Sequence, residues 1–307
     1  MDIFLQQVIN GLVLGSVYAL VALGYTMVYG ILGLINFAHG DVVMVGAFAG
    51  LALLKALLAA GTALPIALAG AALGAVLACG LLGVAIERIA YRPLRHAPRL
   101  APLITAIGVS ILIQYVAAIL WSKQYLALPA AFTPATWQIG GASVTDLQVL
   151  IVLLAGVLMA GLLWLIHGTK LGCAMRATEQ NAEVAGLMGI NTNRVIAATF
   201  LIGSALAALA GIMVLLYYGV AHYFMGFMLG LKAFTAAVLG GIGSVPGAML
   251  GGLMLGLIES LASGYIGDFT GGVFGSNYRD VFAFIVLILV LVLRPAGLLG
   301  RAQGERA

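Results

Sequence analysis

The stretch IFLQQVINGLVLGSVYALVALGYTMVYGILGLINFAHG, residues 3–40, runs for 38 positions without an Asp, Glu, Lys or Arg. A helix needs about 20 predominantly apolar residues to cross the hydrocarbon core of a bilayer. The stretch is therefore long enough for one crossing and the start of a second. It is too long for a barrel strand and lacks the alternation that such strands show, which favours a helical membrane protein.

The same pattern recurs along the rest of the chain. Six further charge-free gaps lie between residues 55 and 87, 99 and 123, 146 and 170, 194 and 232, 232 and 259, and 280 and 294. We expect membrane segments near 8–30, 34–54, 63–86, 101–120, 147–166, 195–217, 229–258 and 279–294. The stretch 124–145 is also uncharged, but its prolines, glycines and hydroxyl residues predict a loop. The sequence thus predicts an all-α integral membrane protein with about eight membrane segments.

The composition excludes a soluble globular protein. Of the 307 residues 63% are hydrophobic and only 8% are charged, whereas a soluble domain carries about 25% charged residues. The few charges also argue against a nucleic-acid-binding surface. The two cysteines, Cys79 and Cys173, are too few for a disulfide framework, so we expect free thiols. The 42 glycines suit closely packed membrane helices, with candidate pairs at Gly11/Gly15, Gly46/Gly50, Gly70/Gly74, Gly247/Gly251 and Gly252/Gly256.

Basic residues predict which loops face the cytoplasm, because Lys and Arg are enriched there. Ten of the fourteen fall in three places: Arg88, Arg92, Arg95 and Arg99; Lys170, Arg176 and Arg194; and Arg294, Arg301 and Arg306. The arginines of 88–99 are accordingly interpreted as topology determinants rather than ligands. Three crossings precede Arg88, which predicts an N-terminus outside and a C-terminus in the cytoplasm.

The count of crossings requires a break within residues 229–258. The string GGIGSVPG at 240–247 cannot continue a regular helix, because it holds four glycines and Pro246. We therefore expect a broken hairpin with arms 229–239 and 247–258 that starts and ends outside. The break either serves packing alone or lines a gate near the midplane, since discontinuous helices frequently build transport sites. The candidate gate residues are Gly240, Gly241, Gly243, Ser244, Pro246 and Gly247.

Motifs for catalysis are missing from the sequence. No lysine follows a glycine, so there is no Walker A motif, and no serine lies in a GxSxG context. The four histidines are scattered, which predicts no metal site. Only Asp41 and Glu259 are candidates for deeper positions, while Glu87, Glu179, Glu183, Asp146, Asp268 and Asp280 fall in loops or at segment ends. Lys232 and Glu259 are expected to be interfacial anchors. This pattern favours a pore for a nearly neutral solute, powered from elsewhere.

Three passages resemble the LivH-type permeases of bacterial ABC importers for branched-chain amino acids. They are ILGLINFAHGDVVMVGAF at 31–48, LGCAMRATEQNAEVAGLMGINTNRV at 171–195 and AVLGGIGSVPGAMLGG at 237–252, followed by LRPAGLLG at 293–300. The resemblance implies one polytopic permease domain over 1–307 in the bacterial inner membrane. It also implies a LivM-type sister permease, two cytoplasmic ATPase subunits that hold ATP and Mg, and a periplasmic substrate-binding protein. This chain would then carry no cofactor and no catalytic residue, and would translocate Leu, Ile and Val.

The resemblance further implies that 168–194 is the cytoplasmic coupling loop. The residues carried over to ATPase coupling are Glu179, Asn181, Ala182, Glu183, Ala185, Gly186 and Gly189. From the residues themselves, Thr178 or Asn181 can cap a short helix, and Val184, Ala185, Leu187 and Met188 supply a small apolar surface. The alternative is a helix that lies on the membrane or on this chain's own cytoplasmic face.

The NFAHG sequence at 36–40 is a second candidate site. Asn36, His39 and Gly40 are spaced to share one helical face, from which Asp41 turns away. They either form interhelical hydrogen bonds, contact the substrate, or belong to a loop without a role. Other functions remain open: an ABC permease for urea, an amide or another amino acid, an ion-coupled secondary transporter, and an intramembrane enzyme, for which we find no clustered polar site.

Overall fold

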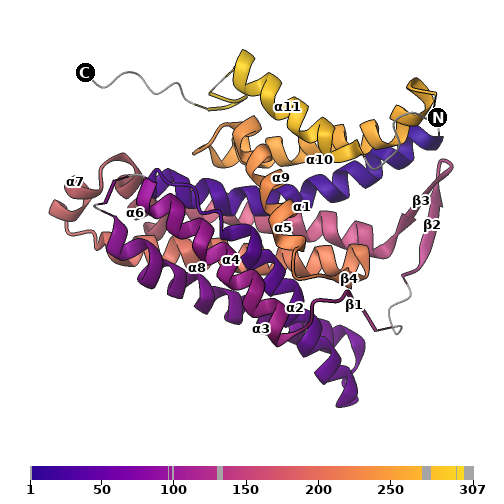
Figure 1. Ribbon diagram of the computed structural model, residues 1–307, viewed down its shortest axis with the longest axis horizontal. Coiled ribbons are helices and arrows are strands. Elements are labelled where there is room, and N and C mark those ends of the chain that lie inside the picture. Colours follow the sequence, from indigo (N-terminus) through magenta and orange to yellow (C-terminus); the bar gives the residue numbers. More distant parts are fainter. Residues whose placement is uncertain are drawn as a thin grey trace. The chain divides into compact units, whose positions relative to one another are not determined.

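The computed structural model describes residues 2–95, 97–98, 100–129, 134–271, 278–294 and 296–300 (Figure 1). Within them, seven α-helices are long and apolar enough to cross a membrane. These are α1 (Asp2–Leu32), α2 (His39–Ala59), α3 (Leu64–Ile86), α4 (Leu100–Leu120), α5 (Asp146–Gly168), α8 (Thr192–Tyr218) and α10 (Val245–Phe269). Two shorter apolar helices are α9 (Met225–Gly240) and α11 (Arg279–Leu293). The predicted all-α membrane fold is confirmed.

The expected segments agree closely with these helices, and the differences lie at their ends. The segment 229–258 overlaps α9 and α10, and the break between these helices at residues 241–244 falls inside the expected break between 239 and 247. The segment 34–54 was placed too early, because α1 continues to Leu32 and α2 begins only at His39. Gly33, whose φ is 63°, ends the first helix, and the residues up to 38 form turns.

Short elements fill the predicted loops. The loop 168–194 contains α6 (Lys170–Gln180) and α7 (Ala182–Leu187), and α3 continues into the π-helix η1 (Glu87–Tyr91) and the 3-10 helix η2 (Arg92–Leu94). The stretch 124–145 is not wholly irregular: β2 (Thr136–Ile139) and β3 (Ala142–Thr145) form an antiparallel hairpin. A second antiparallel pair joins β1 (Leu126–Ala127) to β4 (Val220–Ala221).

The chain divides into two compact units. The first comprises Met1–Thr26, Thr133–Met159 and Lys232–Ala307. Its centre is the contact of α1 with α10, where glycines allow the two backbones to touch: a Cβ at Gly15 would lie 2.8 Å from the Cα of Leu253. A Cβ at Gly252 would in turn lie 2.7 Å from that of Ala19. The close packing that the glycine spacing predicted is thus found here, and the structure shows that its partners are α1 and α10.

The second unit comprises Met27–Phe132 and Ala160–Leu231. Its core lies between α2, α3 and α8, and it too depends on small residues. A Cβ at Gly46 would lie 2.6 Å from the Cα of Ala208, and one at Gly50 would lie 2.8 Å from Cγ1 of Ile212. At the edge of this core, Phe48 stacks on Trp121 with ring centroids 5.3 Å apart. The part of α2 from His39 to Leu51 is therefore largely buried among its neighbours.

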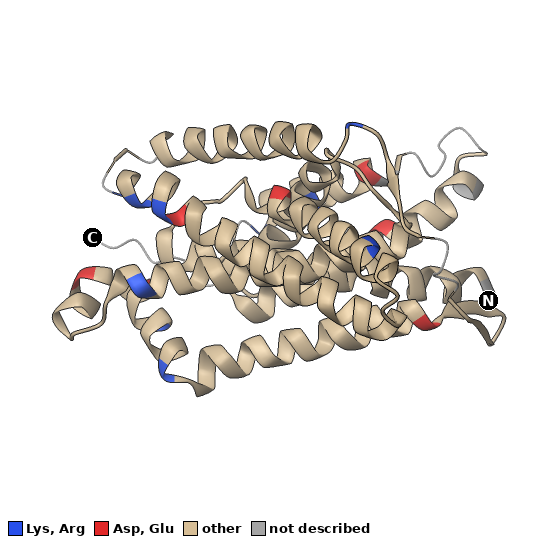
Figure 2. Ribbon diagram, turned by 90° about the horizontal axis from the view of Figure 1, so that it is seen from below, with Lys and Arg blue, Asp and Glu red and all other residues tan. Residues whose placement is uncertain are grey.

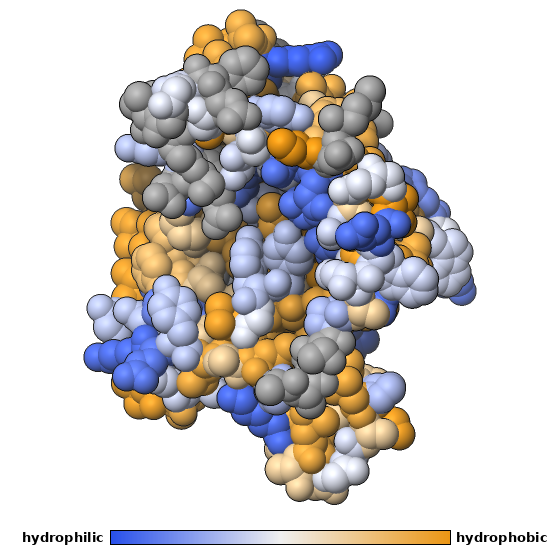
Figure 3. All heavy atoms as spheres, turned by 90° about the vertical axis from the view of Figure 1, so that its right-hand side faces the viewer, coloured by the Kyte–Doolittle hydropathy of each residue, from blue (hydrophilic) through white to orange (hydrophobic). Residues whose placement is uncertain are grey.

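The outward side chains of several helices are apolar, as a hydrocarbon environment requires. Figure 2 shows that most of the helical ribbon carries no charged residue, and hydrophobic side chains cover large areas of the face in Figure 3. The exposed apolar residues of α3 and α4 include Ile66, Leu73, Leu77, Leu81, Ile104, Leu112, Ile119 and Leu120. A soluble protein would not expose so many large apolar side chains on successive turns.

Candidate coupling and translocation sites

The proposed coupling loop contains two short helices with defined caps. The Asn181 side chain accepts hydrogen bonds from the backbone N–H groups of Glu183 and Val184, at 3.0 and 3.1 Å, and so begins α7. Of the two expected caps, Asn181 is therefore the one used. The Thr178 hydroxyl instead donates to the carbonyl of Ala174 within α6. Glu183 lies in the first turn of α7, where a carboxylate suits the helix dipole.

Helix α7 exposes part of its apolar surface. The side chains of Leu187 and Met188 are 87% and 79% exposed, and Val184 is exposed as well. Ala185 differs from the expectation, because it is only 4% exposed and packs against this chain. Around Gly186, by contrast, a Cβ would meet no atom within 4 Å. The exposed apolar surface of α7 therefore consists of Val184, Leu187 and Met188, and excludes Ala185.

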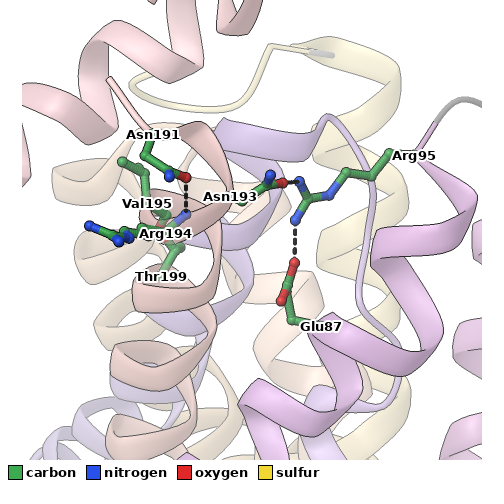
Figure 4. Close-up of polar contacts among 7 residues, drawn as sticks. All are labelled: Glu87, Arg95, Asn191, Asn193, Arg194, Val195 and Thr199. Atoms are coloured by element: carbon green, nitrogen blue, oxygen red, sulfur yellow. Dashed lines mark hydrogen bonds and ion pairs between the residues drawn. The ribbon is translucent and has the colours of Figure 1, made fainter. Parts of the chain in front are cut away.

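A tight connection joins α7 to α8. The backbone N–H of Ile190 donates to the carbonyl of Ala185 at 3.0 Å, and Gly189 adopts a φ of 84°, which only glycine takes readily. Asn191 then caps α8 by accepting from the N–H of Arg194 at 3.1 Å, as Figure 4 shows. Only four residues separate the two helices, so α7 cannot move far without moving the start of α8.

The NFAHG residues do not share one helical face, so that expectation was wrong. Asn36 precedes α2 because the chain turns at 33–38, and the spacing rule applies only inside a helix. Its side-chain oxygen accepts a hydrogen bond from Tyr91 at 3.2 Å, and both residues are buried. His39, also buried, is the first residue of α2. Asn36 thus ties the start of α2 to the π-helix η1.

Gly40 and Asp41 contact different neighbours. Gly40 meets the first turns of α9, where a Cβ would lie 2.8 Å from the Cα of Gly230. Asp41 is buried against α4, and accepts hydrogen bonds from Ser110 at 2.5 Å and Gln114 at 3.0 Å. The neighbours of Asp41 are polar, as an intramembrane carboxylate requires.

The hairpin break consists of a close helix crossing and a short turn with two glycines of positive φ. A Cβ at Gly251 would lie 2.7 Å from the backbone nitrogen of Gly240, and one at Gly247 would lie 3.0 Å from the carbonyl carbon of Gly240. Gly241 and Gly243 have φ values of 107° and 91°, which favour glycine. Ser244 caps α10 by accepting from the N–H of Gly247, with Pro246 in the first turn. Helix α9 ends at Gly240 and α10 begins at Val245, both within the predicted break.

Two residues of the C-terminal motif LRPAGLLG form hydrogen bonds with the end of α9 at this break. The backbone N–H groups of Leu298 and Leu299 donate to the carbonyls of Leu239 and Gly240, each at 2.9 Å. These are end carbonyls of α9, which lack partners within their own helix. The break consequently lies beside the segment that follows α11.

The hairpin arms are longer than expected. Helices α9 and α10 contain 16 and 25 residues, where 11 and 12 were expected. At 1.5 Å per residue α10 is about 37 Å long, enough for a full crossing by itself. The break thus lies at one end of a crossing, which argues against a gate at the midplane.

Lys232 and Glu259 are not interfacial anchors, so that expectation was wrong. Both are buried in the first unit, where the Lys232 ammonium lies 2.7 Å from a Glu259 carboxylate oxygen and 2.6 Å from one of Asp280. Tyr18 donates to the other Glu259 oxygen at 2.9 Å. The charges come from α9, α10 and α11, and their spacing in the sequence could not reveal that they meet.

Arg95 also has a role that the charge pattern did not reveal. Its guanidinium pairs with the buried carboxylate of Glu87 and donates to the side-chain oxygen of Asn193 at 2.6 Å, as Figure 4 shows. Burial lowers the pKa of Arg95 below its ordinary value, and Glu87 opposes that change by stabilising the charge. The eight-residue spacing of Glu87 and Arg95 is a weak signal, and Asn193 has none. His96 and Arg99, and likewise Arg301 and Arg306, lie outside the described residues.

These features define a class of protein. Apolar helices, a discontinuous helical hairpin and a short capped helix between two crossings are the parts of a polytopic membrane transport subunit. Within the described residues no cluster of His, Cys, Asp and Glu could hold a metal ion.

Comparison with known proteins identifies the family. Residues 7–291 match the model described as branched-chain amino acid transport system / permease component, and the chain belongs to this family. It is 46% identical to the permease protein LivH of the high-affinity branched-chain amino acid transport systems of Salmonella typhimurium and Escherichia coli K12, over 99% of this chain and 97% of each relative. It is 45% identical to the corresponding BraD of Pseudomonas aeruginosa, over 99% of this chain and 98% of that one. The chain is a multi-pass inner membrane protein of the permease type.

Proposed function

We propose that this chain is the permease subunit of a bacterial ABC importer that moves Leu, Ile and Val across the inner membrane. The observation that carries the proposal is its 46% identity to LivH along almost the whole chain. The absence of a Walker A motif supports a division of labour, in which ATP and Mg are bound by partner ATPases. The chain then acts as a translocation subunit without a cofactor of its own.

The partners follow from the same proposal. A LivM-type sister permease completes the membrane core, two ATPases bind on the cytoplasmic side, and a periplasmic binding protein delivers the amino acid. The contacts of the coupling loop, 168–194, support the position of the ATPases, because α7 exposes Leu187 and Met188 in a segment rich in basic residues. In this topology the N-terminus lies outside and the C-terminus in the cytoplasm.

The roles of individual residues are part of the proposal. Coupling to the ATPase involves the exposed part of the segment, with Glu179, Asn181, Ala182, Glu183, Gly186 and Gly189, while Ala185 supports it from inside. The path for the solute runs near Asn36, His39 and Gly40. The hairpin residues Gly240, Gly241, Gly243, Ser244, Pro246 and Gly247 shape the crossing of α9 and α10 within the first unit.

Transport in proteoliposomes tests this function. Vesicles would contain this chain, its sister permease and the ATPases, with ATP inside and the binding protein and labelled leucine outside. Leucine uptake is expected only with both ATP and the binding protein. Uptake of urea or an amide in place of leucine would contradict the proposed substrate. Gradient-driven uptake by this chain alone would contradict the importer itself.

A further inference from the structure

Arg95 connects two parts of the second unit that are far apart in sequence. Glu87, its ionic partner, lies at the end of α3, and Asn193, its hydrogen-bond partner, lies in the first turn of α8 (Figure 4). Glu87 is almost fully buried, and the Arg95 side chain is 15% exposed. A solvated topology signal needs no buried partner, so these contacts call for another explanation.

The contacts of Arg95 continue in both directions. On one side, Asn193 follows the short connection from α7, the proposed ATPase contact. On the other, Glu87 begins η1, whose last residue, Tyr91, donates to Asn36 at the start of α2. Tyr91 also packs on Phe200 of α8, with ring centroids 5.3 Å apart. Three side-chain contacts and two short stretches of chain thus link α7 through Arg95 to the NFAHG segment.

The secondary structure at this point is unusual. Residues 87–91 form a π-helix, a rare conformation that frequently occurs at functional sites. A π-helical turn holds one more residue than an α-helical turn, so the helix that continues α3 could convert between the two forms at this point. A guanidinium suits this position, because its planar fork can bond a carboxylate and an amide together, whereas an ammonium is a single point of charge.

We propose that Arg95 is a positioning residue that couples the ATPase contact at α7 to the start of α2. Glu87 ties Arg95 to the end of α3. Asn193 ties Arg95 to the first turn of α8, which moves together with α7. This inference rests on the proposed function, since it assumes that α7 contacts the ATPase.

The test measures coupling rather than stability. In the reconstituted importer, Arg95→Gln is expected to lower leucine uptake about tenfold, a typical size for coupling between sites, while the ATPase stays bound and ATP hydrolysis changes little. The matched control is Arg88→Gln, which removes the same charge from an exposed residue of η1. Its uptake should stay at the wild-type level.

Two milder variants keep the proposal testable if Arg95→Gln fails to fold. Asn193→Ala removes one hydrogen bond at the surface and should raise the ATP consumed per leucine. Asn193→Asp supplies a carboxylate to the same guanidinium and should restore the wild-type ratio. In Glu87→Gln/Arg95→Gln, the loss of coupling should be no larger than in Arg95→Gln, because both residues act through one connection.

The results separate the two proposals. If wild-type vesicles take up no leucine, the proposed function fails before Arg95 is considered. If they do, and Arg95→Gln and Asn193→Ala leave the ratio of ATP to leucine unchanged, Arg95 has no coupling role. Equal losses of uptake and ATP hydrolysis with a lower melting temperature would show a purely structural role and overturn the inference.

Discussion

Lys232 and Glu259 form an ion pair between α9 and α10, with 2.7 Å between Nζ and Oε1 and with side chains 6% and 1% exposed. Charges in a membrane helix need such partners, because the surrounding hydrocarbon offers none. Asp280 of α11 and Tyr18 of α1 complete the group. The Lys232 ammonium of α9 therefore connects this helix to α1, α10 and α11.

Lys232→Met should destabilise the protein, because it removes the Lys232 ammonium from the buried Glu259 carboxylate. Removing one partner of a buried pair costs about 3–5 kcal/mol. Melting temperatures of the purified protein in detergent would measure the loss, with Lys123→Met, at an exposed lysine, as the control. The double variant Lys232→Met/Glu259→Leu should lose less than the sum of its single variants. Equal melting temperatures for the two lysine variants would contradict this account.

The native cysteine Cys173 can report the orientation of the loop 168–194. Cys173 is exposed on α6, and Cys79 is buried in α3. If the loop 168–194 is cytoplasmic, an impermeant maleimide should label Cys173 in inside-out vesicles but leave intact cells unlabelled. Cys173→Ser should abolish the labelling. Labelling of intact cells would reverse the proposed orientation.

Asn181→Ala should loosen α7. The cap supplies acceptors for two N–H groups, and loss of an N-cap side chain costs about 1 kcal/mol of helix stability. Amide hydrogen exchange across 182–187 should become faster, whereas exchange in the core of α8 stays unchanged. Asn181→Asp keeps an acceptor oxygen and should retain protection. Unchanged exchange in the alanine variant would show that the cap contributes little.

Gly247→Leu should impair the protein more than most glycine substitutions, because its side chain would enter the backbone of Gly240. The crossing of α9 and α10 would have to widen, so both the melting temperature and transport should fall. Gly108→Leu is the matched control, since Gly108 faces outward within α4 and a Cβ there meets nothing within 4 Å. Similar behaviour of the two variants would show that the crossing tolerates separation.

Leu187→Glu should reduce retention of the ATPase on purification, because it places a charge in the centre of the exposed surface of α7. Gln180→Glu adds the same charge at an exposed residue of α6 and should have little effect. Ala185→Arg is a poor test of docking, since Ala185 is buried in this chain and an arginine there would disturb folding first. Full retention of the ATPase by Leu187→Glu would remove α7 as the contact.

The helices could be predicted from the sequence because membrane insertion depends on local composition. About 20 apolar residues without a charge suffice for a crossing wherever they occur. The ends of α9 and α10 were predictable for a similar reason, since Gly241, Gly243 and Pro246 restrict the backbone by themselves. The cap at Asn181 follows from a local hydrogen bond and was one of two candidates.

The partners of the buried polar groups were decided only by the tertiary structure. Spacing in sequence says which residues share a face of one helix, but it does not say which helices meet. Lys232 and Glu259 were therefore wrongly predicted to be interfacial anchors, and the partners of Arg95 could not be predicted. The prediction that Asn36 shares a helical face with His39 and Gly40 was wrong for a related reason, because helical spacing has no meaning outside a helix. Hydropathy is a property of each segment, whereas charge pairing depends on segments brought together from distant parts of the chain.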